Sequence, residues 1–139
     1  PPRGPRVDWR AVRRLVGASD VAERLNLAPL EREVAQLSGG NIQRVVLTRT
    51  FLVDEPKLVV VAYPSRGLDL ASVRATQTLL LERRAAGTGV LMVSEDLDEL
   101  MALADRIVVL HDGHVAGIVD PSETDRRDIG RLMLQGEAA

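Results

Sequence analysis

The 139-residue chain has 18 basic and 20 acidic residues, and 45% of it is hydrophobic, which suffices for one domain, or part of one, with a buried core. The net charge of −2 argues against non-specific nucleic-acid binding, so no nucleic-acid partner is expected. The absence of cysteine excludes disulfides and thiolate metal sites, and no apolar run approaches the roughly 18–20 residues that span a bilayer.

Short helices are predicted before residue 30. Residues 1–9 start with proline in place of methionine, which indicates an excerpt or a processed product, and their prolines and glycine predict an extended or disordered leader. Within residues 10–27, apolar positions recur three and four residues apart, which predicts one or two amphipathic helices. We expect a break at Gly17 and a new N-cap at Ser19 or Asp20.

A longer helix is predicted to follow Gly40 and to end before Pro56, because proline cannot continue a helix. Four of its apolar side chains share one face at helical spacing, and we expect this to be its apolar side. They are Ile42, Val45, Val46 and Val53.

The second half of the chain alternates between strands and helices. Residues 58–62 and 90–94 are continuous, mainly apolar and β-branched runs, typical of strands buried on both faces. Helices are predicted over residues 70–86, with Asp69 as the N-cap, and over residues 96–104.

A hairpin and a last helix are predicted at the end of the chain. Residues 106–110 and 114–119 flank Asp112 and Gly113, which is a strong hairpin signal, and a helix covers residues 125–134. The order strand, helix, strand, helix, strand predicts an α/β fold with parallel strands and crossover helices, to which the hairpin adds an antiparallel edge.

The run Ser38-Gly39-Gly40 is a candidate phosphate contact. A small hydroxyl followed by two glycines at the start of a helix allows close approach to the backbone, and the free N–H groups and helix dipole favour phosphate oxygens. Ser38 can add a hydroxyl donor. The alternative is that Ser38 is only a helix N-cap after a glycine turn, and the tripeptide alone does not decide between the two.

Four segments together resemble the ATP-binding cassette (ABC) ATPases of membrane transporters. Residues 37–41 (LSGGN) resemble the signature motif, and residues 56–69 (PKLVVVAYPSRGLD) resemble the Walker B strand and D-loop. Residues 93–100 (VSEDLDEL) resemble the switch segment, and residues 104–115 (ADRIVVLHDGHV) the closing hairpin. The four motifs occur in the family's order, and the resemblance covers residues 36–135. Among the members of the family, the chain most resembles the second cassette of the tandem ATPases of simple-sugar and nucleoside importers.

The chain differs from that family at the positions that carry out ATP hydrolysis. A working Walker B strand ends in Asp-Glu, which helps to hold Mg²⁺ and polarises the attacking water, but here those positions are Ala62 and Tyr63. The switch position, usually a histidine that contacts the γ-phosphate, is Glu95, where a carboxylate would repel phosphate. We therefore expect a degenerate Walker B and a degenerate switch; a plain surface acidic cluster is the alternative for Glu95.

Two further features fit this interpretation. Asp54 and Glu55 spell the missing pair but precede the strand, about 16 Å from its other end, so we expect a solvated helix end there. Lys57 is the only lysine, and no P-loop motif surrounds it. The chain alone is therefore expected to be inactive, although it resembles part of an ATPase coupled to transport.

The resemblance implies that this chain supplies one half of a composite ATP site. ATP and Mg²⁺ would be held mainly by the partner cassette, with neither bound tightly by this chain and no metal site of its own. The residues implied to contact nucleotide in trans, and the D-loop aspartate that faces the partner, are Ser38, Gly39, Gly40, Asn41, Gln43 and Asp69. For Gln43 an ordinary exposed glutamine is the alternative, and for Asp69 a helix N-cap, which is compatible with the D-loop role.

The resemblance also implies a layout and a setting. After the leader, residues 10–56 would be a portion of the helical subdomain with the signature, and residues 57–139 the C-terminal part of a P-loop NTPase core. The implied partners are a second cassette, fused in the same full-length polypeptide, and membrane permease subunits, with the protein peripheral on the cytoplasmic face of the cell membrane. A parallel sheet without its early strands exposes an edge and an apolar face, so the isolated chain is expected to self-associate.

Other interpretations are weaker. A scaffold or regulatory module that kept the cassette fold without a nucleotide role is the main alternative. His111 and His114 flank a tight turn, but two ligands without a third do not make a metal site. The arginines near the N-terminus, Arg10, Arg13 and Arg14 among them, are expected to form a solvated basic face.

Overall fold

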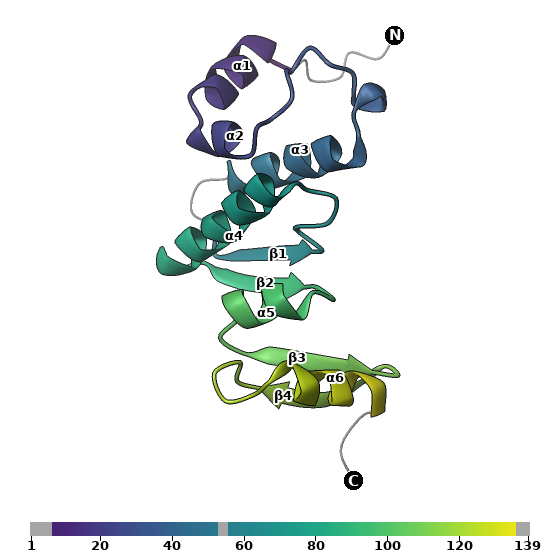
Figure 1. The fold of residues 1–139 in the computed structure, drawn as a ribbon. Helices are drawn as coiled ribbons and strands as arrows, with labels where there is room; N and C mark the ends of the chain where they lie inside the picture. The colour runs from purple at the N-terminus through teal and green to yellow at the C-terminus, as the bar shows by residue number, and fades with distance from the viewer. Residues whose placement is uncertain (1–6, 53–55, 136–139) are drawn as a thin grey trace. The chain divides into compact units, whose positions relative to one another are not determined.

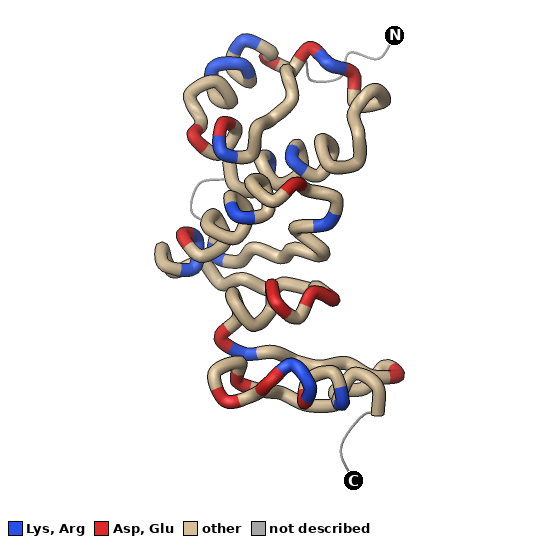
Figure 2. Tube along the Cα trace, in the orientation of Figure 1, with Lys and Arg blue, Asp and Glu red and all other residues tan. Residues whose placement is uncertain are grey.

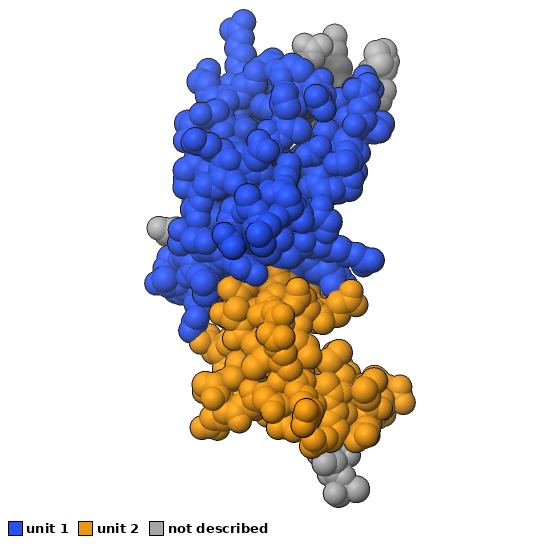
Figure 3. All heavy atoms as spheres, in the orientation of Figure 1, with its two compact units in different colours: residues 1–92 blue, residues 93–139 orange. Residues whose placement is uncertain are grey.

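The computed structural model describes residues 7–52 and 56–135, and the chain divides into two compact units, Pro1–Met92 and Val93–Ala139 (Figures 1 and 3). The two units are described separately. The predicted boundary between residues 56 and 57 is a different one: it separates the helical subdomain of a cassette from the nucleotide-binding core, and it stays a prediction. Among the described residues no helix is long and apolar enough to cross a bilayer.

The first unit begins with the predicted short helices. They are α1 (Trp9–Gly17) and α2 (Asp20–Arg24), and the Ser19 hydroxyl accepts a hydrogen bond from the Ala22 N–H at 3.4 Å. The predicted break at Gly17 and new N-cap at Ser19 are therefore confirmed. A 3-10 turn, η1 (Val34–Gln36), leads to helix α3 (Gly39–Phe51).

Helix α3 buries a different face from the one predicted. Its buried residues are Leu47, Thr48 and Phe51, whereas Ile42, Val45 and Val46 are exposed. Val53 and the acidic pair Asp54-Glu55 lie outside the described residues. The prediction was wrong because the apolar residues of this helix surround most of its circumference, so periodicity alone could not choose the buried side.

Strand β1 (Leu58–Ala62), helix α4 (Leu70–Ala85) and strand β2 (Gly89–Val93) complete the first unit. The strands lie parallel in a two-stranded sheet, as predicted (Figure 1), and α4 connects them along the chain. At the start of β2 the Gly89 N–H donates to the Lys57 carbonyl at 3.0 Å. The Thr88 hydroxyl donates to the Pro56 carbonyl at 2.8 Å, so side-chain and backbone contacts together fix this pairing.

The sheet of the first unit is buried on one face rather than on both. Val59 and Val61 of β1 are 2% and 8% exposed, but the alternate residues Leu58 and Val60 are exposed, and no residue of β2 is fully buried. The expectation that both strands are covered on two faces is therefore wrong for the described chain. A continuous apolar run shows that a strand can be buried on both faces. It is buried on both faces only where a layer of structure packs against each face.

The core of the first unit joins its helices to this sheet. Leu25, which follows α2 directly, has no exposed surface, and Leu79 and Leu80 of α4 are also buried. Arg24 donates to both carboxylate oxygens of Glu82, at 2.8 and 3.1 Å, and this hydrogen bonding raises the pKa of Arg24. The two short helices are thus held on α4 by packing and by one charged pair.

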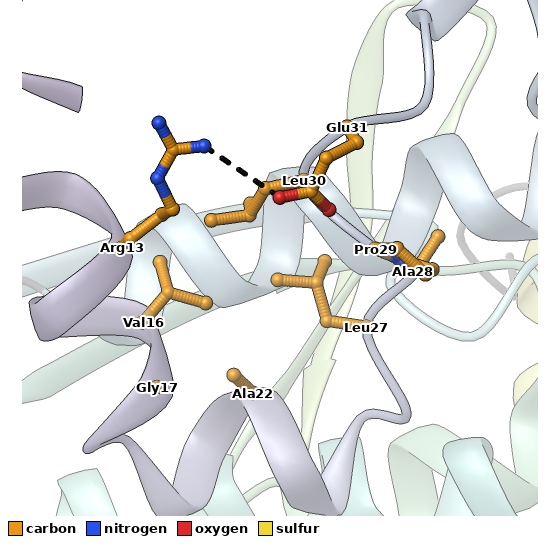
Figure 4. Close-up of a pocket in the computed structure, with 9 residues that line it drawn as sticks. All are labelled: Arg13, Val16, Gly17, Ala22, Leu27, Ala28, Pro29, Leu30 and Glu31. Carbon is orange, nitrogen blue, oxygen red and sulfur yellow. Dashed lines mark ion pairs between the residues drawn. The ribbon is translucent and has the colours of Figure 1, made fainter. Parts of the chain in front are cut away.

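A shallow pocket of about 270 Å³ lies between α1 and the segment 27–31 (Figure 4). Apolar side chains such as Val16 and Leu27 line it, and Arg13 pairs with Glu31 at 3.6 Å beside it. Arg13, one of the arginines predicted to form a solvated basic face, is therefore in an ion pair. The pocket lining contains no nucleophile and no set of metal ligands, so we assign it no chemistry.

The second unit holds helix α5 (Leu97–Leu103), strands β3 (Ile107–His111) and β4 (His114–Val119), and helix α6 (Arg126–Gln135). The antiparallel strands pair His111 with His114 across the turn. Asp112 and Gly113 have φ values of 46° and 77°, as a tight hairpin turn requires. The predicted hairpin is confirmed.

Among the described residues β3 and β4 form a two-stranded sheet within the second unit. The predicted place of this hairpin at the edge of the parallel sheet would join the two units, and it stays a prediction. The turn residues specify the β3–β4 pairing locally. Ile107, Val109, Ala116 and Ile129 of α6 form the core of this unit.

Candidate functional site

The candidate phosphate contact lies at the start of α3. Ser38 precedes the helix in an extended conformation, and its hydroxyl oxygen accepts from the Asn41 N–H at 3.3 Å. The first helical residues, Gly39 and Gly40, have no intrahelical acceptor for their N–H groups. Ser38 and Gly39 are exposed. The sequence alternatives are thus compatible: Ser38 is an N-cap, and the same turn presents N–H groups at the positive end of a helix dipole.

The loop that follows β1 packs against this helix start. A Cβ atom added to Gly40 would lie 2.4 Å from the Gly67 carbonyl oxygen, a separation that real Cβ atoms do not adopt. Gly67 itself has a φ of 74°, which glycine adopts without steric cost. Only glycine at position 40 therefore allows the two backbones to approach this closely.

Gln43 connects the same two segments. Its side-chain amide nitrogen donates to the Tyr63 carbonyl at 3.3 Å and to the Pro64 carbonyl at 3.1 Å. Tyr63 has a φ of 50°, a left-handed conformation that costs energy in a residue other than glycine. The amide nitrogen is thus occupied within this chain, and a contact of Gln43 with nucleotide stays a prediction.

Arg44 makes a third connection. Its guanidinium pairs with the Asp69 carboxylate and also donates to the Asn41 side-chain oxygen at 3.1 Å. The Arg44 side chain is 14% exposed, whereas that of Asp69 is 55% exposed. Because residues 44 and 69 are far apart in the sequence, this ion pair could not be predicted from local pattern.

Asp69 also caps helix α4, as predicted, by accepting from the Ser72 N–H at 3.0 Å. This hydrogen bond holds the pKa of the Asp69 carboxyl below its usual value, assisted by the Ser72 hydroxyl and Arg44 and opposed by partial desolvation. Since the folded-state pKa is lowered, the stabilisation by this carboxylate is full above the unfolded-state pKa of about 3.9. It is lost as the pH falls through the folded-state value.

The end of β1 carries no carboxylate. Ala62 is the last residue of the strand and Tyr63 follows it, with both side chains exposed. The Arg66 guanidinium lies over the Tyr63 ring, 6.0 Å from its centroid, at the outer limit of a cation–π contact. A phenol beside an arginine at this position can neither hold Mg²⁺ nor accept a proton from water near neutral pH.

The switch-like segment belongs to the second unit. Glu95 is exposed and is followed by Asp96, Asp98 and Glu99, and Figure 2 shows that acidic residues gather at the start of α5. Its neighbours have structural roles: Asp96 accepts from the N–H groups of Asp98 and Glu99, and the Ser94 hydroxyl donates to Glu99 at 2.9 Å. The surface acidic cluster is therefore partly a capping arrangement, and a switch role for Glu95 stays a prediction.

The remaining candidates carry no metal chemistry in the described residues. No group of three or more His, Cys, Asp or Glu residues there could hold a metal ion. His111 donates through Nδ1 to the Met133 carbonyl at 2.8 Å, which docks α6 on the hairpin. Sequence reasoning missed Arg44 and Gly67, whose importance depends on contacts with distant residues.

Comparison with solved structures identifies the class. An ATP-binding subunit of an ABC transporter superposes with a TM-score of 0.66 at 25% identity, over 97% of this chain and 62% of that one. The dimeric ABC transporter cassette MJ0796, in a post-hydrolysis state with ADP and Pi, superposes with a TM-score of 0.69 at 23% identity, over 86% and 51%. The fold is that of part of an ABC ATPase cassette.

Curated relatives narrow the group, although no protein-family model matches the chain. The glucose import ATP-binding protein TsgD13 of Haloferax volcanii is 42% identical over 72% of the chain, and the nucleoside import ATP-binding protein NupA of Lactococcus lactis is 39% identical over 73%. The ribose import ATP-binding protein RbsA of the same species is 36% identical over 84%. The chain spans 18%, 20% and 24% of these relatives' lengths. It is homologous to the ATP-binding proteins of ABC importers for sugars and nucleosides.

Proposed function

We propose that this chain provides the signature half of a composite ATP site whose other half lies on a partner cassette, in an importer for sugars or nucleosides. The observation that carries the proposal is the exposed start of α3, where Ser38, Gly39 and Gly40 present a hydroxyl and free N–H groups. At the same time Ala62 and Tyr63 leave the chain's own strand end without a carboxylate. Clamping of a nucleotide fits these residues, and hydrolysis within this chain does not.

The chemistry of the composite site divides between the two cassettes. ATP with Mg²⁺, held mainly by the partner's phosphate loop and Walker B residues, supplies the bond that is hydrolysed. The N–H groups of Gly39 and Gly40 and the hydroxyl of Ser38 would donate to the oxygens of the γ-phosphate. The Asn41 N–H is bonded to the Ser38 oxygen, so a contact of Asn41 with nucleotide would come from its side chain. The Asp69 carboxylate, 55% exposed, remains open to the partner on its outer side while it caps α4. Dimerisation of the MJ0796 cassette, a relative in fold, supports this arrangement.

The names of the relatives support the setting. They are import ATP-binding proteins for glucose, nucleosides and ribose, so we assign this chain to the cytoplasmic face of a membrane beside permease subunits. The second cassette would be fused in the same polypeptide, because the matched part is only 18–24% of the length of these relatives. Closure of the two cassettes on ATP would then move the permease.

Titration calorimetry tests the clamp against the rival function, a scaffold that kept the fold without a nucleotide role. A slowly hydrolysed ATP analogue with Mg²⁺ is titrated into the partner cassette, with and without this chain. Two or three added hydrogen bonds to a charged phosphate should tighten binding at least about tenfold. Equal affinities would remove the clamp and favour the scaffold. This chain alone is the control, and it should not bind the analogue measurably.

We also propose that the isolated chain self-associates through the exposed face of the β1–β2 sheet. Leu58, Val60, Leu91 and Val93 are between 48% and 60% exposed on adjacent strands, and such a face is unfavourable in water. In sedimentation velocity, Val60→Glu should weaken association at least about tenfold, because a carboxylate would have to be desolvated in the contact. Val34→Glu, at a position equally exposed but off the sheet, should change nothing. A wild-type chain that stays at 15.1 kDa at all concentrations would contradict the proposal.

A further inference from the structure

Three independent contacts hold the start of α3 against the loop 63–69. The Gln43 amide donates to two loop carbonyls, the Arg44 guanidinium pairs with Asp69, and Gly40 touches the Gly67 backbone so closely that a side chain has no room. The contacts come from successive turns of the helix and reach both ends of the loop. Together they fix the distance and the rotation of the helix start relative to the strand end.

The loop itself is held in a conformation that its residues would not adopt alone. Tyr63 and Gly67 both have positive φ values, 50° and 74°, and the tyrosine conformation costs on the order of 1 kcal/mol or more. Pro64, whose carbonyl accepts a hydrogen bond from Gln43, is fully buried. A strand end without catalytic carboxylates is thus followed by a strained and well-packed loop, which contacts the signature helix through Gln43 and Arg44 and helix α4 through Ser72.

Arg44 is the best-placed member of this network. Its side chain is 14% exposed, it bridges Asn41 of the helix start and Asp69 of the loop, and its Nε atom is buried without a hydrogen-bond partner. Desolvating one guanidinium nitrogen costs free energy, which the charged contacts must offset. The planar guanidinium reaches both acceptors at once, and a lysine ammonium would reproduce the charge without this geometry.

We propose that Arg44 is a positioning residue, which together with Gln43 locks the signature turn onto the loop 63–69, so that the remaining role of the degenerate strand end is to support the signature. The inference deepens the proposed function and rests on it. It gives the packed loop after Ala62 a role at a strand end that carries no carboxylate.

The test is a double-mutant cycle of Arg44→Gln and Asp69→Asn, chosen because asparagine still caps α4. In the isolated chain, amide hydrogen exchange of Asn41 and Ile42, whose N–H groups are hydrogen-bonded to Ser38, should quicken about tenfold in either variant. The double variant should exchange no faster than either single variant, because all three lose the same contact between Arg44 and Asp69. Arg44→Lys should recover part of the protection. Arg49→Gln, which removes an exposed arginine of the same helix, is the matched control and should match the wild type.

In the full-length transporter the same variants separate positioning from general destabilisation. Arg44→Gln should raise the KM for ATP about tenfold with kcat within about twofold, since the reacting groups belong to the partner, and Arg44→Lys should lie between it and the wild type. Unchanged exchange at Asn41 and Ile42, or additive effects in the cycle, would overturn the inference. A different outcome is possible, in which exchange is faster in Arg44→Gln but Ser38→Arg keeps full ATPase activity. That outcome would support the positioning role of Arg44 and overturn the proposed function.

Discussion

Ser38→Arg is expected to abolish ATP hydrolysis by the full-length transporter, with a loss of at least about a hundredfold. The Ser38 hydroxyl caps α3 through the Asn41 N–H and lies exposed beside Gly39. An arginine there removes the cap, at a cost of about 1 kcal/mol, and fills the space in front of the free N–H groups that the phosphate oxygens must occupy. The measurement is the steady-state ATPase rate of the reconstituted transporter.

Two variants control this experiment. Ser38→Ala removes the hydroxyl without adding bulk, so its rate should lie between those of the wild type and Ser38→Arg. Tyr63→Ala changes the position of the missing catalytic glutamate and should leave turnover within about twofold of the wild type, because a phenol there performs no proton transfer. Full activity in Ser38→Arg would refute the composite site, and a large loss in Tyr63→Ala would refute the degenerate strand end.

Local signals in the sequence predicted the local structure well. Ser19 and Asp69 cap the helices that they were expected to cap, and Asp112-Gly113 forms the expected turn. In each case a short side chain or a glycine satisfies nearby backbone groups or a special φ value, so a few consecutive residues contain all the information. The Ser38 turn belongs to the same category.

Features that depend on a second layer could not be predicted in this way. Val46 and Val60 were expected on covered faces, and both are exposed, because an apolar run does not report what lies opposite. The candidate site divides similarly. Its motif residues were recognisable, but the ion pair of Arg44 with Asp69 and the contact of Gly40 with Gly67 join segments far apart in the sequence. These contacts support the proposal that the loop 63–69 holds the signature turn.

Gly40→Ala is expected to destabilise the isolated chain by about 2 kcal/mol, the usual range for overpacking a tight contact. The new Cβ atom would lie 2.4 Å from the Gly67 carbonyl oxygen. Neither backbone can yield without weakening the Gln43 and Arg44 contacts that hold the two segments together. Alanine is the better helix former by up to about 1 kcal/mol, so the net loss measures the steric conflict after that gain. Thermal unfolding followed by circular dichroism should give a midpoint several degrees lower.

Gly39→Ala is the matched control, because it lies one residue earlier in the same helical turn and its added Cβ atom would meet nothing within 4 Å. The helix-propensity gain then stands alone, and its midpoint should equal or exceed that of the wild type. The two neighbouring substitutions should therefore act in opposite directions on stability. If both raised the midpoint equally, the close approach of Gly40 to Gly67 would not exist in solution. The loop 63–69 could then not support the signature turn, whatever the fate of Ser38→Arg in the transporter.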